Sequence, residues 1–123
     1  TGRPRRVGPI DLVATRYGCR IQGATEVALT KLDVLSYMKE IPVCTQYEVN
    51  GEKTDDFPFT AVIDEAKPVL TTVPGWGCDI SGVRKYEDLP QAARDYVEYV
   101  EQAIGVHISY VSVGAGRDEI IYR

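Results

Sequence analysis

The stretch DLVATRYGCRIQGATEVALT, residues 11–30, indicates the fold class of this protein. Its apolar residues first recur at helical spacing, Asp11 suits the positive N-terminus of such a helix, and Gly23 stands where helices commonly end. The segment EVALT, residues 26–30, is then nearly all apolar without alternation, which is typical of a buried strand in a parallel sheet. A helix followed by a buried strand predicts an α/β fold.

The middle of the chain is predicted to form strands and a hairpin. IPVCTQYEV (41–49) alternates as a strand does, and Asn50-Gly51 predicts a hairpin turn because both residues tolerate positive φ. The return strand begins in EKTDDFPF (52–59), and TAVIDEA (60–66) forms a short helical or irregular turn. KPVLTTVPGW (67–76) is predicted to form another strand, ending at Pro74-Gly75.

The last third of the chain predicts one long helix and one strand. The helix starts after Asp88, a good N-cap, with Pro90 in its first turn, and it ends at Gly105. Its apolar stripe comprises Ala93, Tyr96, Val97, Val100 and Ile104. The strand VHISYVSV (106–113) ends in GAGR (114–117), a glycine pair at a carboxyl end, where α/β folds place ligands.

The composition fits one globular domain and disfavours nucleic-acid binding. The chain has 123 residues, of which 44% are hydrophobic and 26% charged. The first six residues carry three arginines while the whole chain carries −4, so the remaining 117 residues carry −7. A general nucleic-acid binder needs a basic field over much of its surface. An RNA-binding role for RPRR (3–6) is therefore disfavoured by the acidic remainder.

Cysteine spacing and hydropathy indicate a soluble, cytoplasmic protein with no membrane partner. Cys19, Cys44 and Cys78 are odd in number and form no C-x-x-C pair, so neither a zinc knuckle nor a disulfide framework is indicated. A reducing cytosol fits best. No apolar stretch approaches the roughly 18 to 20 residues that span a bilayer.

The triplet Lys31-Leu32-Asp33 suggests purine recognition. In an extended backbone, Lys31 and Asp33 share a face while Leu32 packs inward. A carboxylate so placed accepts from guanine N1–H and its exocyclic amine, and it rejects the wrong base by roughly four orders of magnitude. TKLD (30–33) thus matches the [NT]-K-x-D guanine-specificity element, and SVGAGR (112–117) could approach O6. A solvated Lys–Asp pair and a plain glycine turn are the alternatives.

Five segments together resemble the adenylosuccinate synthetase family. They are TGRPRRVG (1–8), LTKLDVL (29–35), PGW with DISGVR (74–76 and 79–84), DLPQAARDYVEYVEQAIGV (88–106) and SVGAGRDEII (112–121). Each segment is moderately specific, and their order and separations make the resemblance strong. It implies a cytosolic, homodimeric ligase of purine synthesis that joins IMP to L-aspartate with GTP and needs Mg²⁺. In that family the γ-phosphoryl group passes to O6 of IMP, and the aspartate amine then displaces phosphate.

The resemblance also implies roles for residues of this chain. Its aspartate loop corresponds to Thr1, Gly2, Arg3, Pro4 and Arg5. Arg3 would reach IMP and the aspartate carboxylates, and Arg5 would touch aspartate and the GTP side, because guanidinium forks bind carboxylates and phosphates in pairs of hydrogen bonds. The expected guanine contacts are Lys31, Leu32, Asp33, Ser112, Val113 and Gly114.

The resemblance further implies that this chain is the C-terminal segment of a longer protein. It begins at Thr1 and lacks the G-x-x-x-x-G-K-[ST] phosphate loop, so we expect no catalytic residue and no metal ligand in it, and no activity alone. The expected fold is the C-terminal part of a P-loop-NTPase-like, mostly parallel-sheet domain with an added antiparallel hairpin. Within residues 1–123, residues 1–6 form the substrate loop, and 24–35 and 107–117 form the guanine-site elements.

Two further interpretations follow from single features. His107 is the only histidine and stands in a β-branched strand without a surrounding motif, so a structural role is favoured. Trp76 is expected to pack in the core or at an interface. The alternative to a ligase is a non-enzymatic guanine-nucleotide binding module or switch, which rests on TKLD alone.

Overall fold

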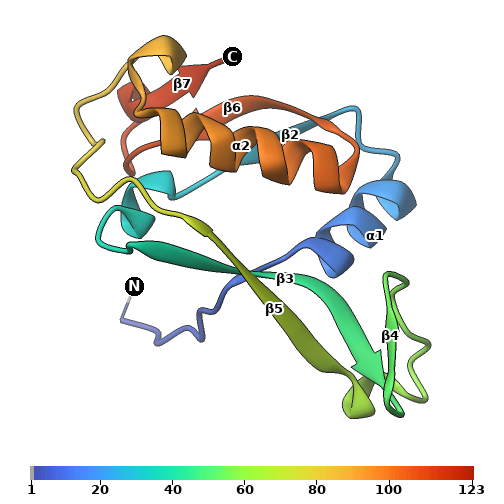
Figure 1. Ribbon diagram of the computed structural model, residues 1–123. Coiled ribbons are helices and arrows are strands. Elements are labelled where there is room, and N and C mark those ends of the chain that lie inside the picture. Colours follow the sequence, from blue (N-terminus) through green and yellow to red (C-terminus); the bar gives the residue numbers. More distant parts are fainter. Residues whose placement is uncertain (1) are drawn as a thin grey trace.

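The computed structural model describes residues 2–123, so Thr1 lies outside the described residues. The main chain forms two α-helices, seven strands and four short 3₁₀ helices in this part of the chain (Figure 1). In chain order they are β1 (Ile10–Asp11), α1 (Leu12–Gln22), β2 (Glu26–Leu29), η1 (Leu32–Leu35), β3 (Glu40–Val49), β4 (Glu52–Thr54), η2 (Ile63–Glu65), β5 (Lys67–Pro74), η3 (Tyr86–Asp88), α2 (Gln91–Ile104), β6 (His107–Ser112), η4 (Arg117–Glu119) and β7 (Ile120–Tyr122).

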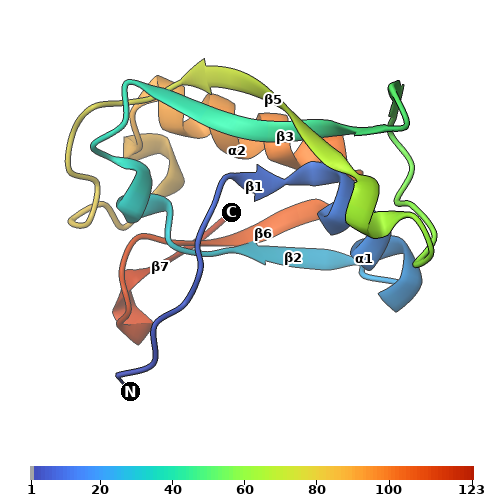
Figure 2. The ribbon, with the colours of Figure 1, turned by 90° about the horizontal axis from the view of Figure 1, so that it is seen from below.

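The strands form two separate sheets (Figure 2). In the first sheet β3 pairs with β1 in parallel and with β4 and β5 in antiparallel fashion. In the second sheet β6 pairs with β2 in parallel and with β7 in antiparallel fashion. The α/β class is confirmed, but the expectation of a mostly parallel sheet is wrong, because β5 and β7 both return antiparallel to the strands they join.

The helix α1 has the predicted ends. The Asp11 side chain accepts a hydrogen bond from the Ala14 N–H at 3.0 Å, which caps the N-terminus. Gly23 adopts a left-handed conformation with φ 63°, and its N–H bonds the carbonyls of the last turn. Both ends are therefore set by local chemistry that the sequence already contains.

The strand β2 is present and forms a parallel pair, as predicted, and its partner is β6. It is not buried, however. Glu26 and Ala28 are exposed, whereas Val27 and Leu29 are half-buried and pack against the core. The strand is at the edge of its sheet, pairing with β6 alone among the described strands. The apolar run therefore predicted more burial of β2 than the other residues of this chain provide.

The Asn50-Gly51 turn joins β3 to β4 as predicted, with φ 53° at Asn50 and 82° at Gly51. The return strand is short, because β4 covers only Glu52–Thr54. The long antiparallel partner of β3 is instead β5, whose register runs from Glu40 opposite Pro74 to Glu48 opposite Lys67. The irregular segment predicted at 60–66 contains the 3₁₀ turn η2.

The helix α2 begins later than predicted. Asp88 is not its N-cap but the last residue of η3, and the helix starts at Gln91 with Pro90 as the flanking residue. The reason is Pro90, which disfavours helical backbone at the preceding residue, and Leu89 is accordingly extended with ψ 144°. The predicted end at Gly105 is confirmed by its left-handed φ of 71°.

The core lies around α2, which contacts β5 of one sheet and β6 of the other. All five residues of the predicted apolar stripe of α2 are buried, and they pack with Ile41 and Val43 of β3 and with Ile108 and Val111 of β6. Burying a large aliphatic side chain contributes roughly 1.5 to 3 kcal/mol. One helix thus holds the two sheets together.

Neither α1 nor α2 is long and apolar enough to cross a membrane, and no other helix in residues 2–123 is either. Three cysteines are present as free thiols in this part of the chain, with Cys19 and Cys44 buried and Cys78 exposed.

Candidate functional site

Three segments were proposed from sequence as parts of the site: the arginine loop, the TKLD element and the glycine turn after β6. They lie toward one end of the molecule, at the left of Figures 1 and 2. Because β2 and β6 run parallel, their carboxyl ends meet at the same edge of the sheet, and η1 and the glycine turn follow those two ends. The N-terminal segment before β1 also runs past η1 there. The fold therefore brings the candidate guanine-site elements together.

A hydrogen bond joins the two candidate guanine-site elements directly. The backbone N–H of Lys31 donates to the Ser112 hydroxyl at 2.9 Å, across 81 residues of sequence. Lys31 itself is in the left-handed region, with φ 62° and ψ 36°. This conformation is uncommon outside glycine and costs on the order of 1 kcal/mol or more, and such strain gathers at functional sites.

The extended backbone expected at residues 31–33 is wrong. The chain turns at Lys31 into the 3₁₀ helix η1, which contains Leu32 and Asp33. Leu32 is buried, as predicted, and anchors the turn in the core. The Lys31 side chain is exposed and that of Asp33 is partly exposed, so both charged groups are accessible. The inference that Lys31 and Asp33 share a face relied on extended backbone. It no longer applies, because a 3₁₀ helix has three residues per turn.

The glycine turn after β6 is closed by Glu119. The Val113 N–H donates to the Glu119 carbonyl at 2.9 Å, and the Glu119 N–H donates to the Gly116 carbonyl at 3.1 Å. The Glu119 carboxylate accepts from the Gly116 N–H and lies against Gly114. A Cβ at Gly114 would collide with that carboxylate, so a side chain there would displace Glu119 from the turn.

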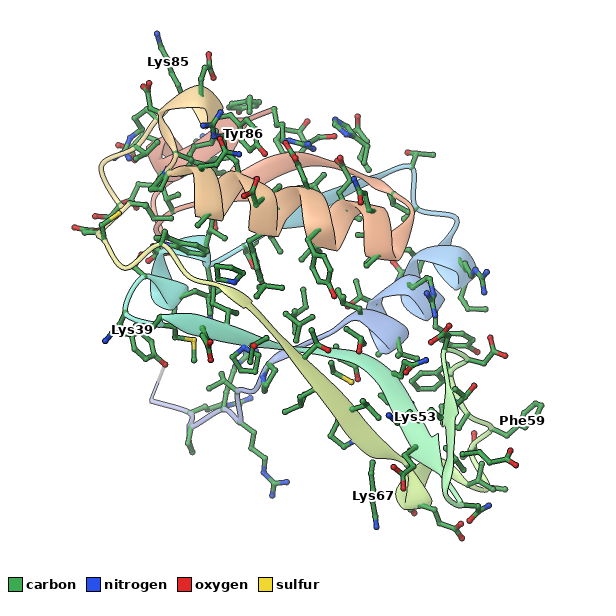
Figure 3. The ribbon with its side chains drawn as sticks, in the orientation of Figure 1. Lys39, Lys53, Phe59, Lys67, Lys85 and Tyr86 are labelled. Carbon is green, nitrogen blue, oxygen red and sulfur yellow. The ribbon has the colours of Figure 1, made fainter. Side chains whose placement is uncertain are left out.

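The PGW segment (74–76) bonds to residues that follow η1. The Trp76 indole N–H donates to the Ser36 hydroxyl at 3.0 Å, directly after η1, and the ring meets Tyr96 edge-on with centroids 5.9 Å apart. The Gly75 N–H donates to the carbonyl of Lys39 at 2.8 Å. Lys39 is labelled at the left of Figure 3. The predicted core packing of Trp76 is confirmed. No pattern in the sequence predicts its hydrogen bond to Ser36.

The arginine loop is exposed at the same end of the molecule. Gly2, Arg3, Pro4 and Arg5 are all exposed, while Thr1 lies outside the described residues. The loop leads into a cleft of about 310 Å³, which the segment 7–10 lines together with residues on and after η1. The segment 7–10 therefore lies beside Val34 and Leu35, the second half of η1.

Comparisons with known proteins bear on this arrangement. Residues 1–121 match the family model described as adenylosuccinate synthetase. The chain belongs to the adenylosuccinate synthetase family. Curated adenylosuccinate synthetases of Mycobacterium tuberculosis (strain H37Rv) and Frankia alni are 49% and 46% identical to it, over 100% and 98% of this chain. Each match covers 29% of the relative, so the chain spans under a third of those proteins.

A solved structure of a fully ligated adenylosuccinate synthetase from Plasmodium falciparum has the same fold. It superposes with a TM-score of 0.91 at 32% identity, covering 98% of this chain and 30% of that one. The mixed α/β architecture described above is therefore that of the adenylosuccinate synthetase family. The P-loop-like class and the C-terminal placement, both predicted from sequence, are not confirmed by these matches.

His107 lies away from the candidate site of this adenylosuccinate synthetase segment. It stands at the amino end of β6, exposed, with its Nδ1 2.9 Å from a carboxylate oxygen of Glu101. The same carboxylate accepts from the Ile108 N–H at 2.8 Å and pairs with the Arg123 guanidinium. Arg123 also lies over the ring of Tyr86, which is labelled in Figure 3. His107 thus belongs to a network that ties α2 to β6 and β7.

Proposed function

We propose that the full-length protein containing this segment joins IMP and L-aspartate with GTP, giving adenylosuccinate, GDP and phosphate. The segment would supply guanine recognition through Lys31, Leu32, Asp33, Ser112, Val113 and Gly114. The single observation that carries this assignment is the 2.9 Å hydrogen bond from the Lys31 N–H to the Ser112 hydroxyl. It fixes the TKLD turn against the glycine turn, so that one purine base can meet both.

The chemistry of guanine explains why these two turns belong together. The Asp33 carboxylate can accept from N1–H and from the exocyclic amine, and the Lys31 stem can cover the flat ring. The N–H groups of Gly114 and Ala115 donate to no acceptor within residues 2–123 and can serve O6. Adenine lacks the matching donors and acceptor, so the same site would reject ATP.

The amino-acid end of the reaction would be held by the arginine loop. Thr1, Gly2, Arg3, Pro4 and Arg5 are proposed to bind IMP and aspartate, and Arg5 also the GTP side. Guanidinium groups suit this task because each can donate two parallel, charge-assisted hydrogen bonds to a carboxylate or phosphate. In the reaction, O6 of IMP attacks the γ-phosphorus of GTP, GDP leaves, and the aspartate amine then displaces phosphate from C6.

Magnesium, which family membership implies, would balance the phosphate charge when bound. Within residues 2–123, no three or more His, Cys, Asp or Glu side chains gather so as to hold a metal ion. Following the family resemblance, we propose that its ligands lie in the remainder of the longer protein, and we expect the isolated segment to be inactive. Homodimer formation and a cytoplasmic location belong to the same proposal.

Phosphate release by the full-length protein tests this function. With GTP present, release should require both IMP and L-aspartate, and ATP should not replace GTP. Hydrolysis of GTP without IMP and aspartate would instead indicate a nucleotide switch. Arg3→Ala should raise the KM for aspartate at least about tenfold, the value of one charge-assisted hydrogen bond. Arg20→Ala, an exposed arginine of α1 outside the substrate loop, is the control and should change this KM little.

A further inference from the structure

The side chain of Glu119 is unusual in the glycine turn, because it fills the turn from inside. Its carboxylate accepts from the Gly116 N–H at 2.5 Å, and its backbone bonds both arms of the turn. An added Cβ at Gly116 would lie 2.8 Å from a carboxylate oxygen of Glu119, and one at Gly114 would be closer still. Neither glycine has positive φ, so no special backbone conformation calls for glycine. The space at Gly114 is filled by Glu119 alone, whereas Gly116 lies against the carboxylates of both Glu119 and Asp118.

The turn contains two backbone donors without an acceptor in the described part of the chain. The N–H of Val113 and that of Gly116 are both taken by Glu119. Those of Gly114 and Ala115, between them, donate to no group among residues 2–123. Glu119 is itself only partly exposed, and no salt bridge to it is formed within this part of the chain. Its carboxylate is instead hydrogen-bonded within the turn, to the Gly116 N–H.

We propose that Glu119 is a positioning residue for nucleotide specificity: it holds the Gly114 and Ala115 N–H groups in place to bind the oxygen at position 6 of the purine. This inference rests on the proposed function. Asp33 reads the N1–H and 2-amino edge, whereas Glu119 acts through the turn on the neighbouring 6-oxo group. The two residues therefore govern different atoms of the same base.

Two analogues of GTP separate these roles in the full-length protein. Inosine triphosphate lacks only the 2-amino group, and 6-thioguanosine triphosphate carries sulfur, a weaker acceptor, in place of O6. For Glu119→Ala we expect the KM for GTP to rise about tenfold with kcat within twofold. The ratio of kcat/KM for GTP to that for the 6-thio analogue should fall by a similar factor. The ratio for GTP to inosine triphosphate should stay within twofold of its value in the unmodified protein.

Two further variants control for charge and for folding. Glu119→Gln keeps an oxygen that can accept from the Gly116 N–H and should recover most of the 6-oxo preference. Asp118→Ala removes a carboxylate from the same turn that accepts no hydrogen bond from it, and it should behave as the unmodified protein.

The proposal is overturned if Glu119→Ala lowers both preferences equally, if it leaves the 6-thio preference intact, or if Asp118→Ala has the same effect. Failure of the proposed function looks different, because the unmodified protein would then release no phosphate in response to IMP and aspartate.

Discussion

Replacing Glu101 by glutamine should abolish a large, acid-sensitive part of this chain's stability. Glu101 lies on α2, and its carboxylate binds Arg123 next to the carboxyl end of β7, the Ile108 N–H of β6, and His107. The hydrogen bond to Arg123, helped by the Ile108 N–H, lowers the pKa of Glu101 from 4.5 to about 2. The side chains of Glu101 and Arg123 are only 23% and 16% exposed, so solvent screens this pair weakly.

The magnitude and sign follow from that shift. At 1.36 kcal/mol per pKa unit, a change from 4.5 to about 2 corresponds to on the order of 3 kcal/mol of folding free energy. The folded pKa is depressed, so this stability is fully present above about pH 4.5. It is lost as the pH falls toward 2, where the unfolded chain has already taken up the proton.

Urea unfolding of the 123-residue chain and its Glu101→Gln variant between pH 7 and 2.5 measures this directly. The difference in free energy of unfolding should be on the order of 3 kcal/mol at pH 7 and should shrink steadily below pH 4.5. Glu98→Gln, at an exposed position on the same helix, should give a small difference at every pH. A Glu101 difference that is equally large at pH 3 and pH 7 would refute the reasoning.

Two further predictions concern the supports of η1. Gly75→Ala should lower the free energy of unfolding by more than about 2 kcal/mol, because the new Cβ would collide with the backbone carbonyl of Met38, which cannot rotate away. Thermal unfolding measures this loss. A melting temperature equal to that of the original chain would contradict the prediction. Trp76→Phe keeps the aromatic contact but removes the bond to Ser36, so it should cost about 1 kcal/mol. Ser36→Ala should cost a similar amount. If the loss in the double variant equals the sum of the two single losses, the two side chains do not interact, and the prediction is contradicted.

Much of the fold was predictable because it is set by local chemistry. Gly23 and Gly105 end their helices in left-handed conformations, and Asn50-Gly51 forms the turn expected of that pair. The apolar stripe of α2 is buried throughout. In each case the residue type and its spacing decide the outcome with little help from the rest of the chain.

The errors arose where distant segments or neighbouring residues decide. Pro90 prevents Asp88 from capping α2, since the residue before proline avoids helical backbone. The pairing of β5 with β3 depends on tertiary contacts, and so does the exposure of β2, which a run of apolar residues cannot reveal.

The candidate site divides in the same way. The residue types at TKLD and SVGAG were visible in the sequence, and the bond from Lys31 to Ser112 brings those segments together. The left-handed backbone at Lys31 was not predictable, because a lysine there carries no sign of positive φ. Nor was the role of Glu119, which becomes apparent only when its carboxylate is seen against the two glycines.

The most direct test of the central claim, that the TKLD turn reads guanine, is the ratio of kcat/KM for GTP to that for xanthosine triphosphate in the full-length protein and its Asp33→Asn variant. Xanthine carries a carbonyl in place of the 2-amino group, and an asparagine amide can donate to it while its oxygen accepts from N1–H. We predict that the ratio falls by at least a hundredfold in the variant, with xanthosine triphosphate becoming a usable substrate. Unchanged use of GTP, with no gain for xanthosine triphosphate, would contradict the assignment.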